Sequence, residues 1–173
     1  MSDKLNKNFF QRDVLEIAPL LPGKKLIRII NGERKEYIIT EVEAYRGMED
    51  LACHASKGRT NRTDIMFQEG GHIYMYLIYG MYWMFNIVTG PENNPQAILI
   101  RAVSGTNGPG KLTRELKMDK SFNAKRIFDS EDIWLEESDF KAELFTGPRI
   151  GVEYAGEYWS QKPWRFYIEV QSK

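Results

Sequence analysis

Hydrophobic positions in the first part of the chain predict a short helical opening followed by a β-hairpin. Residues 7–21 carry apolar side chains with partly helical spacing, and the Pro-Gly pair at 22–23 ends this segment. Residues 25–30 form an apolar run that is typical of a strand, and the Asn-Gly pair at 31–32 is a strong hairpin signal. The return strand is expected over about residues 36–45.

The return strand divides its side chains between two chemically different faces. Successive side chains of a strand point to opposite faces, so one face is expected to carry Ile39, Glu41, Glu43 and Tyr45. The other face is expected to carry Ile38, Thr40, Val42 and Ala44. Burying two carboxylates is costly unless they are paired or functional. A general base that activates water is one interpretation, but the pattern alone favours an exposed polar face.

The central part of the chain predicts further strands separated by turns. A polar connection over residues 46–71, with a short helix near 49–55, is long enough to suggest a functional loop. Apolar runs follow at residues 72–78, 81–88 and 96–103. Because Tyr79 and Gly80 interrupt the first two runs, we expect residues 72–103 to form one antiparallel hairpin that bends at Gly80.

The remaining elements complete one α+β domain. A helix is expected over residues 111–118 and a closing strand over residues 164–170, with weaker strand signals at 133–135 and 154–158. No repeat or linker divides the chain, and 173 residues are enough for one sizeable core. We therefore predict a single domain over residues 1–173, built on a curved, mostly antiparallel β-sheet with flanking helices.

The charge balance argues mildly against a nucleic-acid-binding protein. The 24 basic and 24 acidic residues cancel, whereas such proteins usually carry a basic excess. The distribution is less even, because Lys57, Arg59 and Arg62 have no acid between them and basic residues crowd the segment 111–126. A neutral protein can still present one basic face, although ordinary solvated surface charges are the better explanation of any single run.

The single cysteine, Cys53, excludes an intramolecular disulfide and fits a reducing compartment. A small buried thiol is its simplest role. The polar start of the chain has no apolar signal segment, and no stretch reaches the about 18 apolar residues of a membrane span. No His, Cys or Asp spacing suggests a metal site, so we expect no metal or organic cofactor.

Several other side chains could carry chemistry. His54 follows Glu43 closely in a polar loop, although a lone histidine more often packs than catalyses. Tyr74 and Tyr76 share a strand face, which indicates either an aromatic core or a platform for stacking bases. Tyr79, directly before Gly80, could protrude as a wedge would.

Arg101 places a charge inside an otherwise apolar strand. A guanidinium there needs a carboxylate or phosphate partner. Glu41 or Glu43 would serve, even in a purely structural pair.

Four blocks of the sequence closely resemble the alkyladenine (3-methyladenine, methylpurine) DNA glycosylase family. They are ITEVEAYRGMEDLACHA at 39–55, RTNRTDIMF at 59–67 with GHIYMYLIYGMYWMFNIV at 71–88, QAILIRA at 96–102, and NGPGKL at 107–112 with TGPRIGVEYAG at 146–156. The blocks follow the family's order and spacing. The resemblance implies a monofunctional glycosylase that flips alkylated or deaminated purines, such as 3-methyladenine or hypoxanthine, out of double-stranded DNA. Such an enzyme then hydrolyses the N-glycosidic bond and leaves an abasic site.

The resemblance also assigns the catalytic groups. It makes Glu43, and not Glu41, the base that activates water, a choice that rests on the resemblance alone. Arg101 and the backbone of Val152 match the groups that hold this water. No lysine is placed to form a Schiff base, which implies hydrolysis without strand nicking.

The remaining roles concern the base and the duplex. The resemblance implies that Tyr45 and Tyr76 stack on the flipped base and that His54 lies against the nucleotide. It also implies that Asn86, in the same pocket, disfavours a guanine amino group. Tyr79 matches the residue that enters the duplex. Those implied for other DNA contacts are Arg59, Met81 and Tyr82. The partner is then double-stranded DNA with damaged purines, bound by a monomer in the cytoplasm, at the nucleoid if the source is bacterial.

Two departures from the family pattern concern DNA contacts. Only residues 103–106 separate the third block from NGPGKL, where many relatives have a longer segment with a helix. Glu153 stands where a glycine is common, and an acid there would repel phosphate unless it turned away.

Two other functions remain open. One is a nucleic-acid-binding module without catalysis, which has no need of Glu43. The other is a small-molecule hydrolase that uses Glu43 and His54.

Overall fold

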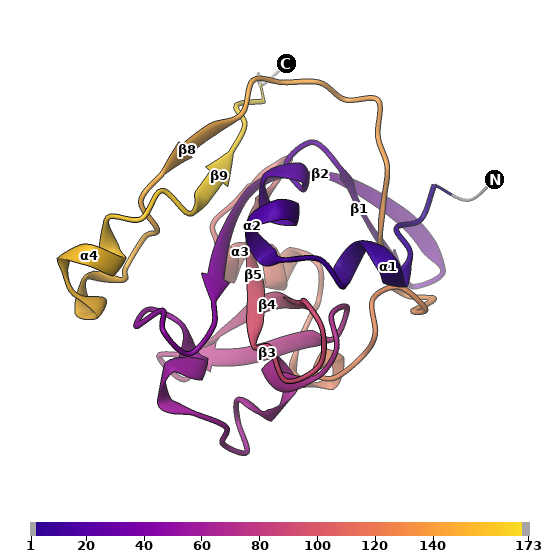
Figure 1. Cartoon of the computed structure of the whole chain (residues 1–173). Coiled ribbons are helices and arrows are strands. Elements are labelled where there is room, and N and C mark those ends of the chain that lie inside the picture. Colours follow the sequence, from indigo (N-terminus) through magenta and orange to yellow (C-terminus); the bar gives the residue numbers. More distant parts are fainter. Residues whose placement is uncertain (1–2, 171–173) are drawn as a thin grey trace.

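A twisted antiparallel sheet organises the molecule, which the computed structural model describes from residue 3 to residue 170 (Figure 1). Its main strand order is β3-β4-β5-β2-β1-β7, and β2 is its longest strand. These strands are β1 (Lys25–Ile30), β2 (Glu33–Arg46), β3 (Ile73–Ile78), β4 (Tyr82–Thr89), β5 (Gln96–Val103) and β7 (Ile133–Glu136). Three short strands extend this path: β6 (Thr106–Asn107) pairs with β5, and β9 (Arg165–Tyr167) pairs with β2 and with β8 (Phe145–Gly147).

Short helices surround the sheet. They are α1 (Lys7–Phe10), α2 (Val14–Ile17), η1 (Ala18–Leu20), η2 (His54–Lys57), η3 (Asp64–Phe67), α3 (Pro109–Glu115), η4 (Lys120–Phe122), η5 (Glu153–Ala155) and α4 (Glu157–Ser160). Helix α3 packs on β4 and β5, and α2 packs on β2. The predicted α+β class with a mostly antiparallel sheet is confirmed.

The sheet is buried on both faces around β3, β4 and β5. Alternate side chains, such as Ile73 and Phe85, belong to the main core with α2 and α3. The intervening ones, such as Tyr74 and Val88, belong to a smaller cluster with Met66 from the connection between β2 and β3. This connection therefore covers the second face of the sheet, and the candidate site lies beneath it.

The prediction of one bent hairpin over residues 72–103 is wrong. Tyr79 and Gly80 reverse the chain, so β3 pairs directly with β4, and β4 with β5. Both turn residues have positive φ, 51° and 65°, and the Met81 amide donates to the Ile78 carbonyl at 3.1 Å. These features match a type I′ turn, whose twist suits a two-residue hairpin. A tyrosine is an unusual residue at positive φ, so the apolar pattern concealed the turn.

The predicted faces of β2 need one correction. Ile39 lies in the main core with Val42 and Ala44, and not on the face of Glu43. The cause is a register shift: Ile39 pairs with Val103 and Val42 with Ile100, with irregular pairing between them. Such bulges shift the alternation of side chains along a strand, and a simple period of two does not reveal them.

Other elements differ from prediction mainly in extent. The opening segment divides because Asp13 accepts from the Leu15 amide and caps a new helix, α2. Residues 154–155 lie in η5 and residues 157–158 lie in α4 instead of in a strand, and the closing strand is limited to β9. In place of the expected helix near residues 49–55, the connection has turns and then η2. Between β5 and α3 the chain makes a tight turn into β6.

Candidate active site

An aromatic pocket lies between the sheet and the connection that joins β2 to β3. It encloses about 320 Å³ of empty space, including its open mouth. Its lining consists of Tyr45, Ala52, His54, Met66, Tyr74, Tyr76, Asn86, Ala97 and Tyr154. The four residues that the sequence suggested for a base pocket, Tyr45, His54, Tyr76 and Asn86, are thus brought together.

Glu43 is completely buried beside this pocket and is held at both carboxylate oxygens. The Tyr45 hydroxyl donates to Oε1 at 2.9 Å, and the backbone amide of Ile150 donates to Oε2 at 2.6 Å. Burial raises the pKa of Glu43, and it outweighs the opposing effects of Arg101, the Ile150 amide and Tyr45. A carboxylate whose pKa is raised towards neutrality is suited to accepting a proton.

Arg101 pairs with both Glu41 and Glu43 of β2, as the sequence suggested. Its Nε lies 3.5 Å from Glu41 Oε2, and its Nη1 lies 3.6 Å from Glu43 Oε1. Glu41 has a second cation, Arg165, at 3.2 Å. Within residues 3–170, Arg101 Nε is buried without a hydrogen-bond partner. This leaves a free donor beside Glu41, on the guanidinium whose Nη1 faces Glu43, and a water or a substrate oxygen could accept from it.

Tyr45 and Tyr76 both remain protonated at neutral pH, because burial raises the pKa of each phenol. The Tyr76 ring lies 4.4 Å from the His54 ring, centre to centre, and the Arg62 guanidinium lies 5.3 Å from the Tyr76 centre. One side of Tyr45 is covered by the Arg149 guanidinium, 4.9 Å away. The pocket therefore has tyrosine walls that buried or charged neighbours hold in place.

His54 is a neutral hydrogen-bonding group at neutral pH. Its Nδ1 lies 2.9 Å from the Tyr74 hydroxyl. Burial, with smaller effects of Arg62 and Lys57, lowers the pKa of His54 to about 4. Asn86 is also buried, and its amide nitrogen donates to the Tyr74 carbonyl at 3.2 Å. Both side chains can contribute polar contacts without adding charge to the pocket.

The turn between β3 and β4 carries exposed apolar side chains. Tyr79 is 87% exposed and Met81 is 63% exposed, which confirms that Tyr79 protrudes. Tyr82 is half-buried against Gly110 at the start of α3, where an added Cβ would lie 2.9 Å from the ring. Of these three side chains, only those of Tyr79 and Met81 extend from the protein surface.

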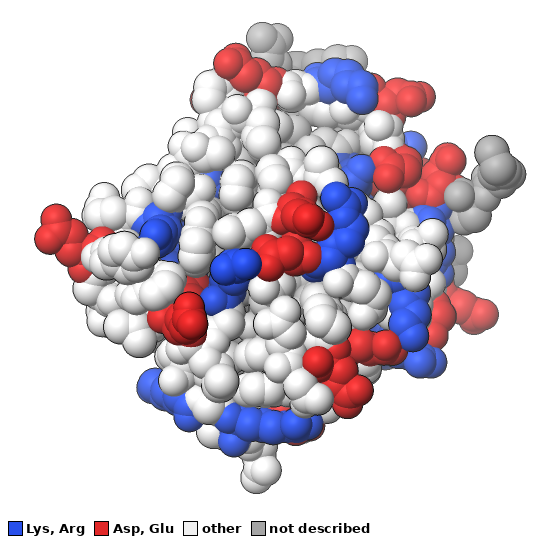
Figure 2. All heavy atoms as spheres, in the orientation of Figure 1, with Lys and Arg blue, Asp and Glu red and all other residues white. Residues whose placement is uncertain are grey.

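The basic residues of the connection between β2 and β3 differ in whether they form ion pairs. Arg59 pairs with Asp64 at 2.7 Å and lies over Phe67, so it also serves the loop itself. Within the described chain Lys57 and Arg62 form no ion pair, and both line a second pocket that shares His54 and Tyr154 with the first. Figure 2 shows basic side chains at the lower edge of the molecule, over this connection.

Val152 does not contact Glu43 through a hydrogen bond in the part of the chain that the structure describes. Its carbonyl accepts from the Ala155 amide at 3.0 Å, and its side chain packs with Ala52. The backbone amide that reaches Glu43 is that of Ile150.

The sequence alone did not identify four residues of the candidate site. Ile150 acts through its backbone, Tyr154 comes from a distant segment, and Arg149 and Asp50 form a buried ion pair. The excess of tyrosines was the signal for Tyr154. No sequence pattern pairs residues 50 and 149.

Other possible chemistry has little support among residues 3–170. Cys53 is buried, as expected, and burial raises the pKa of its thiol to about 12, so the thiol is not a ready nucleophile. The described residues contain no group of three His, Cys, Asp or Glu side chains that could hold a metal ion. Nor does this part of the chain contain a helix of the length and apolarity needed to cross a membrane.

Comparison with known proteins gives a match over nearly the whole chain. The model of the methylpurine-DNA glycosylase family matches residues 8–106 and 103–172. A protein of Natranaerobius thermophilus is 40% identical over 189 residues, covering 95% of each chain. A relative from Borreliella afzelii is 43% identical over 180 residues, which cover 95% of this chain and 96% of the relative. A relative from Legionella pneumophila strain Corby is 42% identical over 175 residues, which cover 96% of this chain and 94% of the relative. All three carry the provisional name 3-methyladenine DNA glycosylase.

Proposed function

Because this chain belongs to the methylpurine-DNA glycosylase family, we propose that it flips a damaged purine out of duplex DNA and hydrolyses the N-glycosidic bond with water activated by Glu43. Membership of the family makes the protein a monofunctional DNA glycosylase, a hydrolase of base excision repair. The observation that carries the finer proposal is the buried carboxylate of Glu43, held at both oxygens beside an aromatic pocket.

Hydrolysis requires one proton acceptor and one attacking water. Ionised Glu43 takes a proton from the water as its oxygen bonds to the anomeric carbon and the bond from that carbon to the purine nitrogen breaks. The electrons of the broken bond remain on the purine, so a cationic alkylpurine leaves as a neutral base. Arg101, which lies 3.6 Å from Glu43 Oε1, can fix the water or stabilise the carboxylate.

The tyrosine walls suit a flat, electron-poor base. Tyr45 and Tyr76 both line the pocket, and an alkylated purine with a positive charge would gain from contact with their rings. Neutral His54 and Asn86 add polar contacts without placing a cation against such a base. Alkylated purines are therefore the substrate class we propose first, with deaminated purines such as hypoxanthine as a second.

The exposed turn between β3 and β4 supports the proposal of base flipping. A ring as exposed as Tyr79 could fill the space that a flipped nucleotide leaves, and Met81 could contact the neighbouring base. Lys57 and Arg62, which have no ion-pair partner among the described residues, are candidates for phosphate contacts beside Arg59. We propose that a monomer binds a single DNA site in the cytoplasm.

The proposal is tested by incubating the protein with duplexes that each carry one 3-methyladenine, 7-methylguanine, hypoxanthine or ethenoadenine. We expect release of at least one free base and an intact strand that heating in alkali then cleaves at the abasic site. DNA binding without release would support the non-catalytic module, and equal turnover of free nucleosides would support the small-molecule hydrolase.

A further inference from the structure

Arg149 forms a buried ion pair with Asp50 next to β2, the strand that carries Glu43. Both its side chain and that of Asp50 are 0% exposed. Arg149 Nη1 and Nη2 donate to the two Asp50 oxygens at 2.6 and 3.0 Å. The same nitrogens also donate to the carbonyls of Ala44 and Trp159, at 3.0 and 3.1 Å. Such a bidentate pair fixes the guanidinium plane as well as its position.

The guanidinium lies behind the wall of the base pocket. It is 4.9 Å from the centre of the Tyr45 ring and 5.0 Å from that of Trp164. Tyr45 lines the pocket, whereas Arg149 and Trp164 do not. The cation thus supports Tyr45 from the side that a bound base would not touch.

Arg149 also reaches Glu43 by two routes through the backbone. The next residue, Ile150, donates its amide to Glu43 Oε2. The carbonyl of Ala44, which joins Glu43 to Tyr45 in the chain, accepts from Arg149. Each oxygen of Glu43 is consequently held by a group that Arg149 fixes, since Oε1 accepts from the supported Tyr45 hydroxyl.

We propose that Arg149, held by Asp50, is a positioning residue that keeps the general base and the stacking ring in one fixed arrangement. The inference rests on the proposed function of Glu43 and Tyr45. Small displacements of a reacting group lower the rate of a chemical step strongly. Loss of Arg149 should therefore slow base release much more than it weakens DNA binding, because its buried side chain cannot touch DNA.

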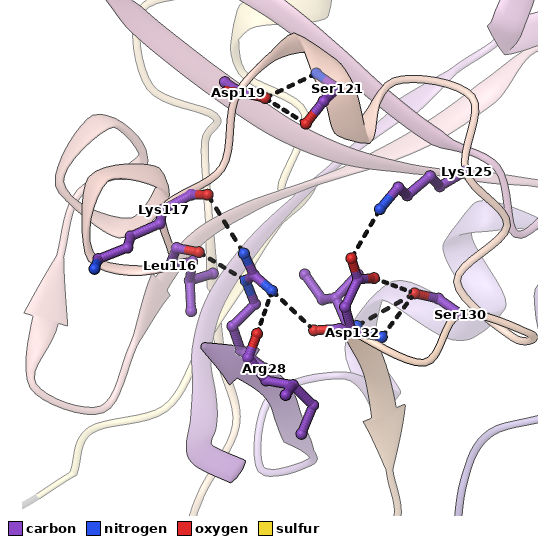
Figure 3. A network of polar contacts seen from close by, with 10 residues as sticks. Arg28, Leu116, Lys117, Asp119, Ser121, Lys125, Ser130 and Asp132 are labelled. Carbon is purple, nitrogen blue, oxygen red and sulfur yellow. Dashed lines mark hydrogen bonds and ion pairs between the residues drawn. The ribbon is translucent and has the colours of Figure 1, made fainter. Parts of the chain in front are cut away.

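A matched control exists in Arg28, the other arginine that the structure buries (Figure 3). It donates to the carbonyls of Leu116 at 2.7 Å, Ile29 at 2.6 Å and Asp132 at 3.1 Å. Arg28 joins β1 to the end of α3 and lines neither pocket of the candidate site. Arg28→Lys therefore removes a buried guanidinium without changing a contact of Glu43.

The test compares Arg149→Lys with Arg28→Lys. Single-turnover base release is measured per folded molecule, and the folded fraction is determined by thermal unfolding. We expect Arg149→Lys to lower the rate by at least about tenfold at neutral pH with unchanged affinity for undamaged duplex, and Arg28→Lys to change it by less than about twofold. The double variant Asp50→Asn/Arg149→Met, which leaves no unpaired buried carboxylate, should also lower it at least tenfold.

The pH dependence supplies a readout that a loss of stability would not move. The hydrogen bond from the Ile150 amide lowers the pKa of Glu43, so its loss should shift the acid limb of the rate to higher pH in Arg149→Lys but not in Arg28→Lys. The ionisable groups that act on Glu43, or that it acts on, are Glu41, Tyr45, Tyr76, Arg101 and Tyr154. All of them remain in both variants.

Two results would overturn the inference. One is a wild-type rate and acid limb in folded Arg149→Lys or in the double variant. The other is an equal loss of rate in Arg149→Lys and Arg28→Lys, which would indicate a general effect of buried arginines. Failure of the proposed function is a separate outcome, because the wild-type protein itself would then release no base.

Discussion

At the scale of single residues, the fall in the rate of base release at acid pH, its acid limb, should follow the protonation of Glu43. Burial raises the pKa of this carboxyl, and only its ionised form can accept a proton from water. The rate of base release should therefore fall on acidification at a pH above the ordinary carboxyl range. Single-turnover rates from pH 4 to pH 8 measure the limb. A rate that stays constant down to the ordinary range would contradict a role for Glu43 as the base.

His54 should make the fold sensitive to mild acid. The pKa of His54 is about 4 in the folded protein and about 6.5 in an unfolded chain. Between these values the unfolded chain binds the proton that the folded chain excludes, so stability falls as pH falls. His54→Gln should remove about 2–3 kcal/mol of this loss between pH 7 and pH 4.5. Urea unfolding at both pH values measures it, and an unchanged difference between them would contradict the assignment.

At the scale of elements, the two hairpin turns make a useful comparison. The turn between β1 and β2 uses Asn31 and Gly32, with φ of 53° and 77°, a pair that such turns favour. The turn between β3 and β4 has Tyr79 at the matching position, with φ of 51°. Tyrosine tolerates this conformation less well than asparagine does, which indicates that the exposed ring has a use beyond the turn.

The variant Tyr79→Asn separates this use from the turn itself. It should raise the free energy of unfolding by about 0.5–1 kcal/mol, because asparagine accepts the left-handed conformation more readily. It should also slow base release from duplex DNA more than from single-stranded DNA, where a flipped nucleotide leaves no space in a duplex stack to be filled. Thermal unfolding and paired release assays measure the two effects. Equal slowing on both substrates would argue against a wedge.

The same elements show what sequence patterns can and cannot predict. Strands β1 and β5 were predicted with their observed bounds, because long apolar runs between turn signals leave little choice. The hairpin at Tyr79 was missed because a tyrosine is unusual at the positive φ that this turn requires, so the pair of Tyr79 and Gly80 indicated only a bend. The bulge that redirects Ile39 was missed because it depends on the neighbouring strand. The pair of Arg149 and Asp50 needs tertiary contacts between segments 99 residues apart.

At the scale of the whole molecule, a formal net charge of zero does not prevent one basic face. Figure 2 shows basic side chains along the connection between β2 and β3, while acids and bases are interspersed elsewhere in that view. The connection between β7 and β8, which contains Lys141, runs along the opposite side of the molecule in Figure 1. DNA binding should therefore depend on where a cation lies and not on the total charge.

Salt dependence measures this arrangement directly. Lys57→Ala and Arg62→Ala should each lower by about one the slope of log affinity against log salt concentration, because each removes about one phosphate contact. Lys141→Ala removes an exposed cation on the far side and should leave the slope unchanged. Fluorescence anisotropy with an undamaged duplex gives the slopes. Equal effects of all three variants would argue against a localised DNA-binding face.

We propose that Glu43, and not its neighbour Glu41, activates the water. The test measures the single-turnover release of an alkylated purine from duplex DNA by Glu43→Gln and by Glu41→Gln at neutral pH. We predict a loss of at least about 10²-fold for Glu43→Gln with DNA binding retained, and a loss below about tenfold for Glu41→Gln. If Glu43→Gln releases base at the wild-type rate, or if Glu41→Gln loses as much activity as Glu43→Gln, Glu43 is not the specific base.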